Sequence, residues 1–216
     1  MTEKFFDEIN DLKSDVITFS WFAEQMLKNS IEALINLDKN LAKDVKKRKK
    51  ELVQTSYQIE EKIFSIIALY QPVARDMRTV VCSLGVVNAA ERIGTYGKDI
   101  ANIVRDFPER PHIENLVSIP HMADLVIDII GDTINSYELE DISLLAKLSE
   151  RDDVVDSLKR SIFRECITYM MEDPRNIAIC THYVMIGRYL ERSADHACRV
   201  AEKVHYMVTG ERVEIK

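Results

Sequence analysis

Apolar residues recur along most of the chain at the three-to-four-residue spacing of an amphipathic helix. Residues 2–40 carry this pattern without a helix-breaking residue, and it resumes after a basic stretch and continues to Tyr70. The 216 residues include only six glycines and five prolines. This composition favours long helices over many short strands, so the pattern predicts an all-α fold.

The few breakers divide the chain into helices. Pro72 fits the first turn of a third helix, where a missing N–H costs nothing, and this helix is predicted to reach about Arg105. The one proline-rich break follows at residues 107–112. Asp173 is a predicted N-cap for the last helix, and Gly210 is its predicted left-handed C-cap. The helices predicted beyond the break cover residues 114–137, 142–172 and 174–208.

The last helix has a counterpart in the first half of the chain. Each copy follows a proline at a helix boundary, Pro72 or Pro174. Identical residues recur at a constant separation in Glu91 and Glu191, Arg92 and Arg192, Ala101 and Ala201, and Val104 and Val204. This similarity indicates a duplicated unit of about a hundred residues. The prediction is six long helices arranged as two tandem three-helix repeats, residues 1–108 and 109–216.

Charge and hydropathy narrow the class of function. The net charge is −7, which speaks against a general nucleic-acid-binding protein. No apolar run reaches the roughly 20 residues of a membrane span, and the charged N-terminus does not read as a signal peptide. The four cysteines are scattered without a CxxC motif. They are expected to be reduced, buried thiols in a cytoplasmic protein.

Paired acids on the last helix are the first candidate for chemistry. Glu191 and Asp195 stand four residues apart, one helical turn from each other and opposite the apolar stripe. Such a pair can close on one hard cation, bridge two cations, or be ordinary solvated acid. The spacing alone leaves these interpretations open.

The motifs QPVARDMR, AERIG, YMMEDPR and RYLERSADHACRVAEKVHYMVTGE closely resemble the PhoU family over roughly residues 5–212. The resemblance implies tandem three-helix bundles and a cytoplasmic, non-enzymatic regulator of phosphate uptake and homeostasis. It implies a homodimer whose partners are the ATPase subunit of a phosphate ABC transporter, a membrane sensor kinase, or both. It also implies metal binding through E(D)xxxD motifs.

The second repeat carries this metal motif twice. Glu191 and Asp195 supply one copy, and Asp152 and Asp156 supply the other on the preceding helix. Four carboxylates would form a hard site for divalent or trivalent ions, with iron, zinc, manganese and magnesium as candidates.

The first repeat departs from this pattern. Glu91 is kept, but the position four residues later is Thr95. The preceding helix has Lys49 and Val53 in the region that we match to the second repeat's aspartates. Positive charge has therefore replaced negative charge, and this half is predicted to bind metal weakly or not at all.

A basic run precedes the second helical pattern. It is either the solvated start of a helix or a patch for an acidic partner or the anionic membrane surface, which would allow peripheral membrane association. Its members are Lys46, Lys47, Arg48, Lys49 and Lys50.

Other motifs give weaker signals. Glu202 and His205 form one helical ExxH, whereas di-iron proteins of the ferritin type need two on facing helices. Gly94 and Gly97 are predicted to allow close helix packing. No nucleophile, base and orienting group are assembled in one motif. The alternative function is a metal-dependent, phosphatase-like hydrolase that uses the carboxylates to activate water.

Overall fold

The computed structural model describes residues 3–108, 111–113 and 118–215, and every long element within them is helical. Two short 3₁₀ turns, η1 (Ile142–Leu145) and η2 (Pro174–Asn176), flank the fifth long helix. No strand occurs in these ranges. The prediction of an all-α protein with six long helices is confirmed. The helices are α1 (Glu3–Asn36), α2 (Lys39–Tyr70), α3 (Ala74–Asp106), α4 (Ser118–Leu139), α5 (Leu148–Glu172) and α6 (Ile177–Thr209).

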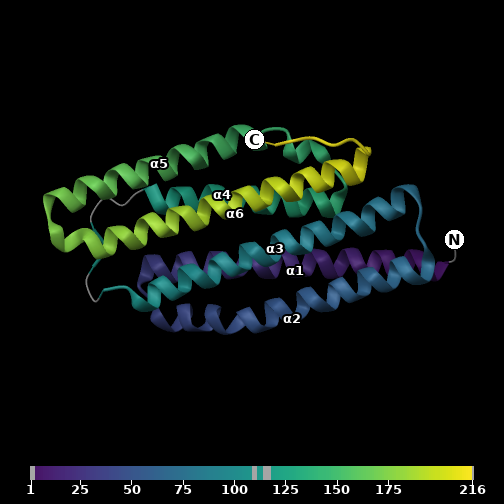
Figure 1. Cartoon of the computed structure of the whole chain (residues 1–216), viewed down its shortest axis with the longest axis horizontal. Coiled ribbons are helices and arrows are strands. Elements are labelled where there is room, and N and C mark those ends of the chain that lie inside the picture. Colours follow the sequence, from purple (N-terminus) through teal and green to yellow (C-terminus); the bar gives the residue numbers. More distant parts are fainter. Residues whose placement is uncertain (1–2, 109–110, 114–117, 216) are drawn as a thin grey trace.

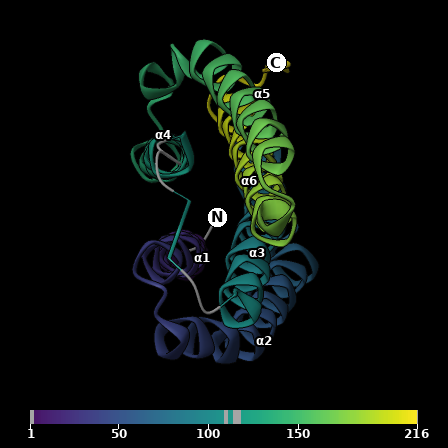
Figure 2. The same cartoon turned by 90° about the vertical axis from the view of Figure 1, so that its left-hand side faces the viewer.

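The helices form two elongated bundles that lie side by side (Figure 1). The first bundle contains α1 to α3 and the second contains α4 to α6. Viewed along the bundles, α3 packs against α6 and α1 packs against α4 (Figure 2). The tandem three-helix repeats are therefore confirmed as a structural arrangement. The boundary at residue 108 stays a prediction, since residues 109–110 and 114–117 lie outside the described residues.

Two predicted helix caps are present. The Asp173 side chain accepts a hydrogen bond from the Arg175 backbone N–H at the start of η2. Gly210 follows α6 with φ of 79°, and its N–H donates to the Tyr206 carbonyl. The prediction for Gly210 is confirmed, because an achiral residue adopts the left-handed conformation that ends a helix. Asp173 caps the turn η2 rather than the last helix itself, since α6 begins at Ile177 with Asn176 as its N-cap.

The predicted starts of the third and fifth helices are also wrong. Pro72 lies in the turn before α3 rather than in its first helical turn, and the helix begins at Ala74. The reversal from α2 needs three residues, beginning with Gln71 in the left-handed region at φ 46°. The helix predicted over 142–172 is divided, since 142–145 form η1 and α5 starts at Leu148. The Asp141 side chain caps η1 through the Ser143 N–H.

The core runs through both bundles and contains the small residues predicted to allow close packing. A Cβ added to Gly97 would lie 2.7 Å from the Leu27 backbone nitrogen on α1. A Cβ on Gly94 would lie 2.8 Å from a methyl carbon of Leu52 on α2. The two glycines therefore let α3 approach both other helices of its bundle, as predicted. All four cysteines are free and buried, as the sequence suggested.

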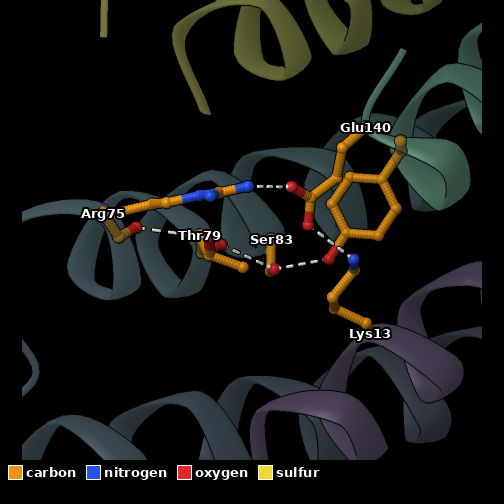
Figure 3. A network of polar contacts seen from close by, with 6 residues as sticks. Lys13, Arg75, Thr79, Ser83 and Glu140 are labelled. Atoms are coloured by element: carbon orange, nitrogen blue, oxygen red, sulfur yellow. Dashed lines mark hydrogen bonds and ion pairs between the residues drawn. The ribbon is translucent and has the colours of Figure 1, made fainter. Parts of the chain in front are cut away.

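A polar network fastens the second repeat to the first at one end of the junction (Figure 3). Glu140, just after α4, accepts from Lys13 of α1 at 2.7 Å and from Arg75 of α3 at 2.5 Å. The buried Tyr137 hydroxyl lies 2.6 Å from the Ser83 hydroxyl, which itself donates to the Thr79 carbonyl. Tyr137 therefore donates to Ser83, and the chain of bonds ends on the α3 backbone.

Glu140→Gln is expected to remove part of the protein's acid sensitivity. The hydrogen bond from Lys13 and that from Arg75 lower the pKa of Glu140 below its usual value of 4.5. A lowered folded-state pKa stabilises the protein above the unfolded pKa, and this contribution is lost as pH falls through the folded value. Urea unfolding at pH 7 should show a loss of about 1 kcal/mol for the variant.

Urea unfolding repeated at lower pH provides the control. Between pH 5 and pH 3 the variant should lose less stability than wild type, because its side chain cannot be protonated. The exposed neighbour Glu138 can be changed to Gln as the matched variant, and its pH profile should follow wild type. Parallel profiles for wild type and Glu140→Gln would contradict the assignment.

Within the described ranges, no helix combines the length and apolar character needed to cross a membrane.

Candidate functional site

The predicted acidic residues lie on two neighbouring helices of the second bundle. Asp152 and Asp156 come from α5, and Glu191 and Asp195 come from α6, which packs against it. Burial raises the pKa of Asp152, and the negative charges of Asp195 and Asp156 raise it further. Burial and then the charge of Glu191 raise the pKa of Asp195. The structure therefore brings the four carboxylates into one electrostatic environment.

Basic side chains offset part of this negative charge. Glu191 accepts from Lys159 at 2.8 Å and lies 3.7 Å from Arg192. Arg192 also donates to Asp195 at 3.3 Å. Within the described residues, no three His, Cys, Asp or Glu side chains are arranged to hold a metal ion. Metal binding by the four carboxylates stays a prediction.

The donor chemistry fits a hard cation nevertheless. Carboxylate oxygens are preferred ligands of such ions. Burial raises the pKa values of Asp152 and Asp195, and the negative charges of neighbouring carboxylates raise them further. A cation bound here would relieve that repulsion, and it would compete with Lys159 for Glu191.

Cys198 adjoins this cluster on α6. Its buried thiol is hydrogen-bonded to Asp152, and burial together with the Asp152 charge raises the pKa of Cys198 to about 12. The group is therefore a neutral thiol at pH 7.

The corresponding region of the first repeat contains an internal cation. The Lys49 ammonium of α2 lies 3.1 Å from Glu91 Oε1 and 2.7 Å from Thr95 Oγ1 on α3. Thr95 in turn donates to the Glu91 carbonyl. A lysine therefore neutralises the single retained carboxylate, which supports the prediction of weak or absent metal binding in this repeat.

The basic run does not form one surface. Lys46, Lys47 and Lys50 are exposed, and Lys47 forms an ion pair with Asp44 at 2.8 Å. Arg48 instead lies over the Phe22 ring, 5.4 Å from its centroid, and Lys49 points toward α3. Consecutive helical residues project about 100° apart, so five in a row cannot face one partner. A contact role for the basic run stays a prediction, and its exposed members are Lys46, Lys47 and Lys50.

The helical ExxH motif has a structural role. Glu202 accepts a hydrogen bond from the Ile215 N–H at 3.1 Å. The His205 Nδ1 atom lies 3.1 Å from the Glu211 carbonyl. Both side chains therefore hold the C-terminal tail against α6.

A cluster of arginines at the α3–α6 contact was missed by the sequence analysis. It surrounds His196, whose pKa falls to about 4 through burial and then through the charges of Arg199, Arg92 and Arg192. His196 is therefore neutral at pH 7. The only signal along the sequence is the four-residue spacing of Arg188 and Arg192 on one helix. Arg92 joins the arginine cluster only because α3 packs against α6.

Comparisons with known proteins agree with this architecture. The PhoU domain matches twice, over residues 16–104 and 119–204. A Rhizobium meliloti relative named "Phosphate-specific transport system accessory protein PhoU homolog" is 35% identical over 95% of this chain and 87% of its own length. A Clostridium acetobutylicum relative of the same name is 30% identical over 100% of this chain and 99% of its own. The crystal structure of PhoU from Pseudomonas aeruginosa superposes with a TM-score of 0.90 and 30% identity, covering 96% of this chain and 100% of that one.

Proposed function

The chain belongs to the PhoU family, and from this we propose that it is an accessory regulator of phosphate transport that acts by protein contact rather than catalysis. The observation that carries the proposal is similarity over both repeats to relatives named as accessory proteins of the phosphate-specific transport system. The proposed partners are the ATPase subunit of the phosphate ABC transporter and a membrane sensor kinase. The proposed location is the cytoplasm.

The outer face of α5 is the contact surface that we favour. Phe163, Ile167 and Met171 follow one another at four-residue spacing and are 54%, 41% and 81% exposed. Large apolar side chains in a row on one helix face are a common mode of protein recognition. A second copy of the chain is an alternative occupant of this face, which would give the proposed homodimer. The exposed lysines Lys46 and Lys50 would add attraction to an acidic partner or anionic lipid.

Pull-down with the purified transporter ATPase subunit and sensor kinase tests the contact. Wild type should retain at least one of them, and Phe163→Ser/Met171→Ser should lose most of this binding. Tyr57→Ser/Phe64→Ser is the matched control, because those α2 side chains are 61% and 52% exposed. Light scattering of each variant shows whether self-association changes instead. Failure of wild type to retain either protein would refute the contact mechanism.

We also propose that the second repeat holds one or more iron, zinc, manganese or magnesium ions. Asp152, Asp156, Glu191 and Asp195 would be the ligands, and the bound charge would join α5 to α6. Metal content after anoxic, metal-replete purification should fall strongly in Asp152→Asn/Asp195→Asn, and the melting temperature should then no longer respond to added metal. Glu91→Gln should keep the metal content of wild type and its rise in melting temperature with added metal. Loss of metal in Glu91→Gln alone would reverse the assignment.

The hydrolase alternative has a direct test. Phosphatase activity that requires added iron, manganese or magnesium, and that is abolished in Asp195→Asn, would replace the regulatory proposal with an enzymatic one.

A further inference from the structure

Four arginines line one open hollow between the two repeats. Arg92 comes from α3, whereas Arg188, Arg192 and Arg199 come from α6, one turn and then two turns apart. The hollow has a volume of about 600 Å³. All four side chains belong to exposed residues, so a ligand can reach them from solvent. This gathering of positive charge occurs in a chain whose net charge is −7.

Aromatic rings form part of the wall of this hollow. Tyr96 of α3 stacks on Tyr189 of α6 with ring centroids 5.7 Å apart, and His196 lies 5.9 Å from Tyr96. The Arg92 guanidinium lies 5.3 Å above the Tyr96 ring and donates to the Tyr96 hydroxyl at 3.2 Å. The stacked rings therefore join the two repeats and hold Arg92 in place on the edge of the hollow.

The charges of this cluster are only partly balanced. Arg192 pairs with Asp195 and, at longer range, with Glu191. Neither Arg188 nor Arg199 has a hydrogen bond or ion pair among the residues that the structure describes. Guanidinium groups held together without an acidic partner repel one another and concentrate anions around them. The cluster has the character of a site prepared for a negatively charged ligand.

We propose that this hollow binds a small molecule with two or more adjacent phosphate groups. Guanidinium forks donate paired hydrogen bonds to phosphate oxygens, and tetrahedral phosphates can accept them from several directions at once. A row of linked phosphates matches cations spread along one helix better than a single carboxylate does. Inorganic pyrophosphate and a nucleoside polyphosphate share this chemistry, and the half-buried rings of Tyr189 and His196 would add stacking for a base.

Such a ligand would bridge the two halves of the protein. Arg92 belongs to the first repeat, and Arg188 and Arg199 belong to the second. Binding would therefore stabilise the α3–α6 contact and raise the melting temperature. This inference does not depend on the proposed regulation of phosphate transport, and either can fail without the other.

The neighbouring hollow between α5 and α6 is a weaker candidate. It includes Arg188 and Arg192, but Glu191 and Lys159 form an ion pair within it and Phe163 contributes an apolar side chain. The Glu191 carboxylate lines this hollow and would repel an added anion, whereas the lining residues of the α3–α6 hollow include no acidic side chain.

Calorimetric titration tests the proposal with phosphate, pyrophosphate, tripolyphosphate, ATP and sulfate at equal ionic strength. Wild type should bind pyrophosphate or ATP at least about tenfold more tightly than sulfate. Tighter binding of ATP than of tripolyphosphate would identify a nucleotide as the ligand class. Equal binding of ATP and tripolyphosphate would show that the polyphosphate group is sufficient. Both results support the proposal.

Arg188→Gln/Arg199→Gln should weaken this binding at least about tenfold and abolish the ligand-induced rise in melting temperature. Arg188→Lys/Arg199→Lys keeps the charge but loses the paired hydrogen bonds, and it should bind with intermediate affinity. Arg105→Gln/Arg175→Gln is the charge-matched control, because both residues are exposed and pair with aspartates one or two residues away.

Three results would overturn the inference. One is wild-type binding of pyrophosphate and ATP no tighter than sulfate. Another is equal binding by wild type and the Arg188→Gln/Arg199→Gln variant. Displacement of pyrophosphate by an acidic peptide at lower concentration than by ATP would also reject it in favour of a protein partner.

Discussion

Gly97→Ala is expected to lower the free energy of unfolding by about 2 kcal/mol, although alanine is the better helix former. The added methyl group would lie 2.7 Å from the Leu27 nitrogen and 2.8 Å from the Met26 carbonyl carbon and oxygen. These are backbone atoms of α1, so they cannot rotate away as a flexible side chain could. Helices α1 and α3 must separate, which weakens packing throughout the first bundle.

Urea unfolding followed by circular dichroism at 222 nm measures the effect. Gly131→Ala is the matched control, because its new methyl group would be 3.7 Å from the Trp21 side chain, an ordinary van der Waals distance. That variant should be neutral or more stable by up to about 1 kcal/mol, through the higher helix propensity of alanine. Equal urea midpoints for Gly97→Ala and wild type would contradict the prediction, because they would show that the bundle accommodates the added methyl group without losing stability.

The helical architecture could be predicted because it depends on local signals. Apolar periodicity identified the helices, scarce prolines and glycines marked their ends, and the recurrence of Glu91 as Glu191 indicated the duplication. The errors occurred where a turn had to reverse the chain. Pro72 can begin a helix in isolation, but the left-handed Gln71 and extended Val73 put it in the loop.

The candidate sites were less predictable because they depend on contacts between helices. The four-residue spacing of Glu191 and Asp195 placed them on one face, but it could not show that Lys159 of α5 reaches Glu191. Likewise, Lys49 appeared as part of a basic surface run, yet it neutralises Glu91 on the next helix. The arginine hollow requires α3 to pack on α6, a contact that no local pattern specifies.

His112, between the two repeats, also makes contacts with helices that are distant in the sequence. Its Nε2 atom lies 2.8 Å from the Leu34 carbonyl, which can only accept, so Nε2 carries the proton and donates. Its Nδ1 atom lies 2.7 Å from the Tyr183 hydroxyl and accepts from it in this tautomer. The imidazole also packs 5.3 Å from the Phe107 ring. One side chain between the repeats therefore joins α1 of the first repeat to α6 of the second.

His112→Ala is accordingly expected to destabilise the protein by about 2 kcal/mol, from two lost hydrogen bonds and the lost ring packing. Differential scanning calorimetry of wild type, His112→Ala and the exposed-histidine control His121→Ala measures this loss. A double-mutant cycle with Tyr183→Phe separates the contributions, because only the Nδ1 hydrogen bond should show coupling, at about 1 kcal/mol. A His112→Ala variant as stable as the His121→Ala control would mean that the helix contacts α3–α6 and α1–α4 hold the repeats together without this residue.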